Sequence, residues 1–129
     1  MIWSVAIGGA MGSVARFLLS GLIQRSSGTI FPIWTLVINV TGSLLLGFLM
    51  RYLIDGVSVS AEMRVLLTAG FCGGYTTFST FSYETVSLIE QGDWGRSALY
   101  VTLSVVLSIL GTFAGVAIAK ELIARLRGA

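Results

Sequence analysis

The sequence predicts an all-α integral membrane protein that crosses the bilayer with four transmembrane helices. The first observation is composition: 55% of the 129 residues are hydrophobic, only 11% are charged, and the mean hydropathy is +0.91. In a soluble domain about a quarter of the residues are usually charged, so this chain lacks the polar side chains that a water-exposed surface needs. The second observation is a set of long apolar stretches, each close to the ~20 residues with which a helix crosses a ~30 Å hydrocarbon core.

The predicted spans cover residues 2–23, 33–54, 65–90 and 97–119. The first lacks the basic leader region and clear cleavage site of a signal peptide, so it is interpreted as a mature span. Pro32, the only proline, is typical of a helix start and precedes the second span. The connectors are short, and we expect a single membrane domain over residues 1–129.

Several function classes are disfavoured by composition. The net charge is only +2, and its thinly spread basic residues do not form a nucleic-acid-binding surface. Histidine is absent and Cys72 is the single cysteine, so Cys/His zinc sites and Ser/His or Cys/His catalytic pairs cannot form within one chain. No phosphate-binding loop pattern is present. We therefore expect a protein that is not an enzyme.

The distribution of basic residues predicts that the chain can insert into the membrane in either orientation. With an even number of spans, one side of the membrane holds five basic residues and the other holds three. These are Arg51, Arg64, Lys120, Arg125 and Arg127 on one side, and Arg16, Arg25 and Arg96 on the other. The bias is weak under the positive-inside rule, so the chain could insert both ways up and pair antiparallel.

Small residues recur at four-residue spacing in every predicted span. The pairs are Gly8 and Gly12, Ser43 and Gly47, Gly70 and Gly74, and Gly111 and Gly115. Such pairs let helix backbones approach closely in lipid, where no hydrophobic force drives helices together. They predict a tightly packed bundle but no particular activity.

The third predicted span differs from an ordinary membrane helix. Residues 68–84 read TAGFCGGYTTFSTFSYE, with a Gly73–Gly74 pair followed by five hydroxyl residues. Glycine is a poor helix former, so this pattern predicts a break in the helix near mid-membrane depth. A broken backbone survives there only inside protein or beside a water-filled cavity, and discontinuous helices are where ion carriers place their sites. Residues 73–82 are therefore a candidate functional segment, with a kinked but well-packed helix as the alternative.

Polar and aromatic side chains around this segment suggest an anion route. Phe78 and Phe81 share a helix face, and the positive edges of their rings can meet an anion, although core packing is the more usual role. Asn39 is a buried amide in the second span, and a hydroxyl stripe follows the fourth span at Tyr100, Ser104, Ser108 and Thr112. The stripe could bind a neighbouring helix or line a narrow pore. Uncharged donors suit an anion that must be held and then released.

Glu84 and Arg16 are the charged residues within the spans that need an explanation. Ionisable residues inside membranes are commonly functional. Both lie toward segment ends in the predicted spans, however, so anchoring by snorkelling is an equal alternative.

At this point the sequence resembles a known family. The segment GGYTTFSTFS at residues 73–82, followed by Glu84, resembles the signature of the Fluc family of bacterial fluoride channels, also called CrcB proteins. GGAMGSVAR at residues 8–16 and WTLVIN at residues 34–39 resemble that family's first and second spans. The likeness covers nearly the whole chain in order and spacing. Tyr75 departs from the pattern, because leucine is common at that position, but the frame of the motif is intact.

The resemblance implies a fluoride-selective channel in the bacterial inner membrane, through which fluoride leaves the cytoplasm passively and its toxicity falls. It implies an antiparallel, dual-topology homodimer with two fluoride pathways, surrounded by the lipid bilayer. A structural sodium ion would be held at the dimer interface by the backbone carbonyls of Gly73 and Thr76. The pathway residues that it implies are Asn39, Thr77, Phe78, Thr80, Phe81, Glu84, Tyr100, Ser104 and Ser108.

Two other functions remain open from the residues. A small multidrug exporter also has four spans and forms an antiparallel dimer, but proton-coupled export needs a central carboxylate in the first span, where this chain has no acid. A non-transporting membrane subunit would explain the small-residue pairs but not the break in the third span. Substitution of Phe78 or Phe81 discriminates, because loss of fluoride flux without misfolding excludes the structural role.

Overall fold

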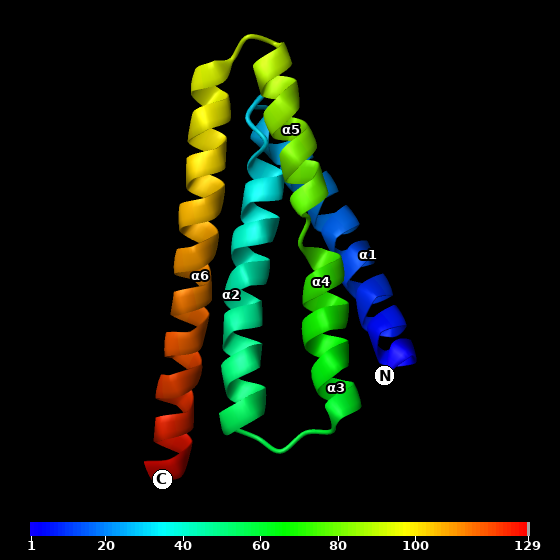
Figure 1. Ribbon diagram of the computed structural model, residues 1–129, viewed down its shortest axis with the longest axis vertical. Coiled ribbons are helices and arrows are strands. Elements are labelled where there is room, and N and C mark those ends of the chain that lie inside the picture. Colours follow the sequence, from blue (N-terminus) through cyan, green and yellow to red (C-terminus); the bar gives the residue numbers. More distant parts are fainter. Residues whose placement is uncertain (129) are drawn as a thin grey trace.

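The computed structural model describes residues 1–128, and within this range all of the regular secondary structure is helical (Figure 1). Three long helices are α1 (Ile2–Ser27), α2 (Ile33–Asp55) and α6 (Trp94–Gly128). Each is long and apolar enough to cross a membrane. Between α2 and α6 lies a composite segment: α3 (Ala61–Val65), the π-helix η1 (Leu66–Cys72), α4 (Gly73–Tyr75) and α5 (Phe78–Glu90).

The helix ends follow from local chemistry. α1 runs beyond its predicted end to Ser27 and stops at Gly28, whose φ of 54° is a left-handed conformation that glycine adopts without strain. α2 begins directly after Pro32, as the sequence predicts. α6 begins earlier than predicted, at Trp94, where the Asp93 carboxylate accepts a bond from the Arg96 amide at 3.1 Å and so caps the first turn. It also ends nine residues later than the predicted limit of 119.

The composite segment is interrupted, as the sequence of residues 65–90 predicts, and it also contains a π-helix that the sequence did not predict. Its first half winds as a π-helix, a form that is rare and occurs often at functional sites. Its second half, α5, starts again after an interruption at Thr76 and Thr77. In Figure 1 a thin connection joins α4 to α5 at this point.

Close backbone contacts hold the helices in two pairs. α1 packs on η1 and α4, and α2 packs along α6. Gly8 and Gly12 lie against the backbone of η1: a Cβ atom at Gly8 would lie 2.9 Å from the Phe71 amide nitrogen. Gly115 lies against α2, where a Cβ atom would meet the Leu44 carbonyl oxygen and come within 2.7 Å of the Phe48 amide nitrogen. The small-residue pairs predicted for packing are therefore confirmed as contact points of both pairs.

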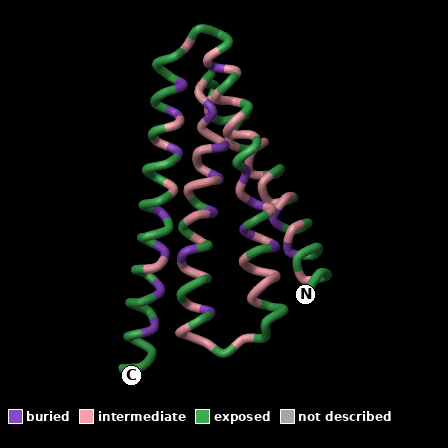
Figure 2. Tube along the Cα trace, in the orientation of Figure 1, coloured by how far each residue is buried: buried purple, intermediate pink, exposed green. Residues whose placement is uncertain are grey.

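The outer surface is apolar. Buried positions run along the inner sides of the helices, and exposed positions cover the outside (Figure 2). Large apolar side chains are exposed on every long helix, including Phe17 (77%), Ile54 (56%) and Phe113 (69%). A surface of this kind is stable against lipid or another apolar partner, as composition predicted.

Candidate functional site

The interruption in the composite segment is the first feature of the site. Thr76 (φ −80°, ψ 158°) and Thr77 (φ −149°, ψ 109°) are extended. The glycines do not form the break: Gly73 has helical angles (φ −64°, ψ −38°), and Gly74 belongs to the same short helix. The predicted break exists, and it begins two residues after the Gly–Gly pair. Gly74 serves instead in a close contact with α1. A Cβ atom there would lie 3.0 Å from Gly9 Cα.

Asn39 of α2 supports the extended residues. Its Oδ1 accepts a hydrogen bond from the Thr77 amide at 2.8 Å, and its Nδ2 donates to the Thr77 carbonyl at 3.1 Å. One side-chain amide thus replaces the backbone partners that Thr77 loses when the helix stops. This explains a buried amide in an apolar helix, because an unpaired polar group in hydrocarbon is costly.

The break releases backbone carbonyls. In a continuous helix the Thr77 amide would donate to Gly73, and the Thr80 amide would donate to Thr76. Here those amides donate instead to Asn39 and, at 3.2 Å, to the Thr77 hydroxyl, which caps α5. The carbonyls of Gly73 and Thr76 are therefore free of their helical donors.

Arg16 lies at the break and is not an end anchor. Its Nη1 donates to the Thr76 carbonyl at 3.4 Å, although the two residues are 60 positions apart. The neighbouring Ser13 hydroxyl donates to the Gly74 carbonyl at 3.5 Å. α1 therefore contributes polar groups to one side of the break while α2 contributes Asn39 to another.

A groove of about 380 Å³ opens beside the break. It brings together side chains from α2, the interruption, α5 and α6, which are distant in sequence. Six of the predicted pathway residues line it, namely Asn39, Thr77, Phe78, Phe81, Ser104 and Ser108. Hydroxyl and amide groups and two aromatic rings thus share one apolar-walled groove with no charged side chain in its lining.

The two phenylalanines differ in their surroundings. Their ring centroids are 5.4 Å apart with the planes tilted by 50°. Phe78 is 78% exposed, whereas Phe81 also contacts Tyr100 at 5.3 Å between centroids. Phe78 begins α5, so it stands at the helix end whose amide groups and dipole favour negative charge.

The remaining predicted pathway residues do not line this groove. Tyr100 is fully buried behind Phe81 and contacts Phe31 edge-on. The Thr80 hydroxyl accepts a bond from the Thr77 hydroxyl at 2.9 Å. Glu84 accepts a hydrogen bond from the buried Thr35 hydroxyl and lies in a separate, smaller pocket near Pro32.

Two buried hydroxyls on α6 have no hydrogen-bond partner within the described part of the chain. These are the Tyr100 hydroxyl and the Ser104 Oγ. Buried polar atoms are nearly always bonded, so the unpaired Ser104 hydroxyl, which lines the groove, indicates capacity for a ligand or water there. The hydroxyl stripe predicted on the fourth span is thus partly available for binding. Thr112, the last member, is different because it donates to the Ser43 carbonyl at 3.3 Å and ties α6 to α2.

Sequence reasoning missed several lining residues. Gly42, Ser43, Leu46, Val105 and Ile109 also line the groove. Ser43 lies one helical turn after Asn39, and that spacing could have identified it. Thr35, the partner of Glu84, lies one turn before Asn39 on the same face. The apolar members carry no signal that separates them from lipid-facing residues.

Tyr75, the departure from the family pattern, has a local role. Its ring stacks on Phe71 with centroids 6.0 Å apart, and its hydroxyl is 2.8 Å from the Thr41 hydroxyl. The larger side chain therefore fits between the composite segment and α2 with its polar atom bonded.

Fold and site together define a multi-pass α-helical membrane protein in which a discontinuous helical segment meets a groove lined by uncharged polar groups. The family model of the CrcB-like protein, Camphor Resistance (CrcB), matches residues 3–116. The chain belongs to this family.

Several curated relatives match over most of their length. A protein of Geobacter sulfurreducens named fluoride-specific ion channel FluC is 46% identical over 121 residues, which are 94% of this chain and 98% of the relative. A relative with the same name from Aquifex aeolicus is 42% identical over 95% of this chain and 98% of its own length. Another so named, from Methanopyrus kandleri, is 49% identical over 90% of this chain and 86% of its own length. These three relatives therefore share one name, and each is matched over most of its length.

Proposed function

We propose that this protein is a fluoride channel that lets fluoride leave the cytoplasm passively and so lowers its toxicity. The observation that carries the proposal is the groove at the broken helix, lined by uncharged donors and aromatic rings, in a chain 42–49% identical to proteins named fluoride-specific ion channels. Fluoride is small and strongly hydrated, so a pathway must replace its water with close donors. Donors without fixed charge can release the ion again.

The pathway residues act in three groups. Asn39 and Thr77 hold the break in place, and the ring edges of Phe78 and Phe81 with the hydroxyls of Ser104 and Ser108 meet the ion along the groove. Tyr100, Thr80 and Glu84 form a further set toward the α5–α6 end. Tyr100 has an unpaired buried hydroxyl, and Thr80 and Glu84 extend the chain of hydroxyl and carboxyl groups away from the groove.

The complete pathway requires a second copy. The groove is open on one side, and the outer surfaces of the helices are apolar. We infer that the composite segment completes a fourth crossing and that two chains pair antiparallel as a dual-topology homodimer. The weak charge bias of five basic residues against three supports insertion both ways up. A bacterial inner membrane is the expected location.

The break also suits a structural sodium ion. Sodium is a hard cation that binds carbonyl oxygens, and unwound carbonyls coordinate it in transporters. The carbonyls of Gly73 and Thr76 have lost their helical donors, so the donor set fits, although the Thr76 carbonyl also accepts the long bond from Arg16. No group of three His, Cys, Asp or Glu residues that could hold a metal exists in the described range. A bound ion would supply a fixed positive charge between the subunits.

Fluoride efflux from liposomes tests the function. Purified protein in vesicles loaded with fluoride should release it rapidly and should move little chloride. No release from a well-folded dimer in sodium buffer would contradict a single-chain channel and favour a non-transporting subunit. Proton-coupled drug uptake without fluoride release would instead favour the multidrug exporter.

A further inference from the structure

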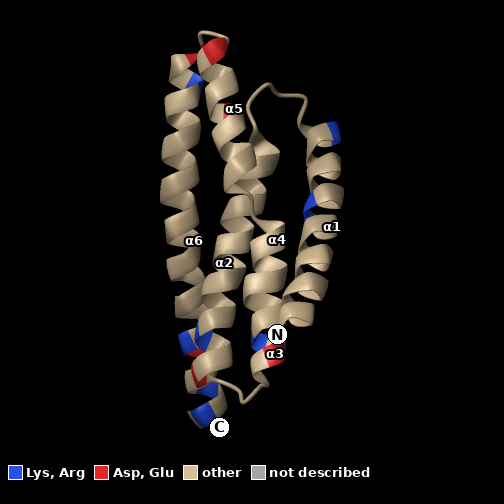
Figure 3. Ribbon diagram, turned by 45° about the vertical axis from the view of Figure 1, so that its right-hand side comes forward, with Lys and Arg blue, Asp and Glu red and all other residues tan. Residues whose placement is uncertain are grey.

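The end of α6 extends well beyond the part of the helix that a membrane needs. Its 35 residues correspond to ~52 Å, against a hydrocarbon core of ~30 Å. Charged side chains gather at this end of the bundle, where the C-terminus lies, and are sparse along its middle (Figure 3). The last part of α6 and the end of α2 therefore project together into the membrane surface region.

A polar cleft lies between these two helix ends. It has a volume of about 580 Å³ and is lined by Arg51, Asp55, Lys120, Ile123, Ala124 and Arg127. Residues 120, 123, 124 and 127 fall on one face of α6 by helical spacing. Ile123 is buried at 7% exposure and packs this face against α2.

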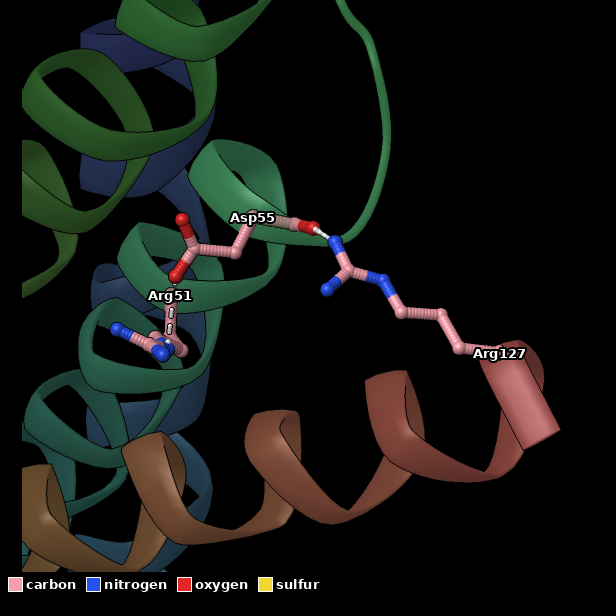
Figure 4. A network of polar contacts seen from close by, with 3 residues as sticks. All are labelled: Arg51, Asp55 and Arg127. Carbon is pink, nitrogen blue, oxygen red and sulfur yellow. Dashed lines mark hydrogen bonds and ion pairs between the residues drawn. The ribbon is translucent and has the colours of Figure 1, made fainter.

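The cleft holds more positive charge than its own residues neutralise. The Arg51 Nε pairs with the Asp55 carboxylate at 2.9 Å. The Arg127 Nη2 donates to the Asp55 carbonyl oxygen at 2.6 Å, and this oxygen carries no charge (Figure 4). Lys120 has no ion pair within the described residues. Three cations and one anion thus leave a net charge of +2 in one cleft.

The opposite face of α6 fixes the depth of the cleft. Ile118, Leu122 and Leu126 follow one another at four-residue spacing and are 52%, 36% and 58% exposed. Apolar side chains exposed this far along α6 favour contact with lipid, while Lys and Arg beside them reach toward the headgroups. The cleft therefore lies at the depth of the lipid phosphates.

We propose that this cleft binds the phosphate of an anionic phospholipid. A guanidinium presents several donors in a plane that fits phosphate oxygens, and Arg127 uses one of its donors on the Asp55 carbonyl. Lys120 adds an unpaired ammonium group. Basic clefts between transmembrane helices at the membrane surface bind anionic headgroups. A lipid, unlike a free anion, is held by the bilayer at this depth.

The experiment uses the purified full chain in zwitterionic detergent, with bound lipids counted by native mass spectrometry. Phosphatidylglycerol, phosphatidylcholine and inorganic phosphate are titrated separately. Lys120→Gln and Arg127→Gln should each weaken phosphatidylglycerol binding by about fivefold, the factor that corresponds to one basic residue near an anionic surface. Lys120→Gln should leave the fold intact, since the Lys120 ammonium group takes part in none of the ion pairs of the described residues.

Arg125→Gln is the matched control. It removes the same charge from the same helix end, but Arg125 pairs with Glu121 at 2.9 Å outside the cleft. Its binding of phosphatidylglycerol should stay within about twofold of the wild type. The reason is that solvent and salt screen an exposed charge outside the cleft from a phosphate bound inside it. Equal weakening by Arg125→Gln and Lys120→Gln, or wild-type binding that does not distinguish phosphatidylglycerol from phosphatidylcholine, would overturn the proposal. Binding of inorganic phosphate with the same dependence on Lys120 would show a free-anion site and overturn the lipid as ligand.

Discussion

The contact between α2 and α6 differs from the interruption at Thr76–Thr77 in how backbone groups find their hydrogen-bond partners. Along α2 and α6, continuous helices satisfy their own backbone groups, and glycines such as Gly47 and Gly115 let the two backbones touch. At the interruption the backbone cannot satisfy itself, and Asn39 supplies the missing partners from another helix. Close packing of the two backbones stabilises the α2–α6 contact, whereas a few directed hydrogen bonds stabilise the interruption.

This difference separates stability from function within the bundle. A contact built from glycine against backbone tolerates no added atom, because neither side can move far. An interruption held by side-chain bonds leaves polar groups available to a ligand, as the unpaired hydroxyl of Ser104 illustrates. Substitutions in the first region should therefore act mainly on folding, and those in the second on ion passage.

The largest effect is expected at Gly115. Gly115→Ala places a Cβ atom against the Leu44 carbonyl oxygen and 2.7 Å from the Phe48 amide nitrogen, so the free energy of unfolding should fall by about 3 kcal/mol. Unfolding in mixed detergent micelles measures the change. Gly21→Ala is the control, because its added Cβ meets no atom within 4 Å and should stabilise the helix by about 0.5 kcal/mol. Equal responses of the two variants would show that α2 and α6 are not in rigid contact.

An intermediate effect is expected at Asn39. Asn39→Ala leaves the amide and carbonyl of Thr77 unpaired, which should reduce the free energy of unfolding by about 2 kcal/mol. Fluoride efflux should fall by roughly tenfold or more, because a displaced break should raise the free-energy barrier to ion passage. A rise of about 1.4 kcal/mol in that barrier slows passage tenfold. Ser43→Ala, which lines the same groove without bonding Thr77, should leave stability unchanged. Normal efflux with lowered stability in Asn39→Ala would make Asn39 purely structural.

The smallest effect on stability is expected at Phe78. Because its ring is 78% exposed, Phe78→Leu should change the free energy of unfolding by less than about 0.5 kcal/mol. Phe81→Leu loses the ring contact with Tyr100 and should cost about 1 kcal/mol. Both substitutions should reduce fluoride efflux. A Phe78→Leu variant with wild-type efflux would remove this ring from the pathway, and an equal loss of stability at both positions would contradict the different burial of the two rings.

Much of this molecule was predictable because lipid imposes strong local rules. Helices must satisfy their own backbone in hydrocarbon, so apolar length alone locates α1, α2 and α6. The small-residue pairs locate the close contacts, and the Gly–Gly and hydroxyl pattern locates the interrupted segment. The break lies at Thr76 and Thr77, inside the predicted segment of residues 73–82. The separate role of Gly74 in the approach to Gly9 could not be predicted, because it is a contact between distant parts of the chain.

The sequence by itself determined the membrane environment, the helical class and the family, since these depend on composition and on motifs read in order. Only the tertiary structure decided that Arg16 reaches the Thr76 carbonyl, that Asn39 holds both backbone groups of Thr77, and that Glu84 pairs with Thr35 away from the groove. It also brought Arg51 and Arg127 into one cleft around Asp55. The physical reason is that each of these pairings joins side chains to partners on other helices, and their distances depend on how the helices pack.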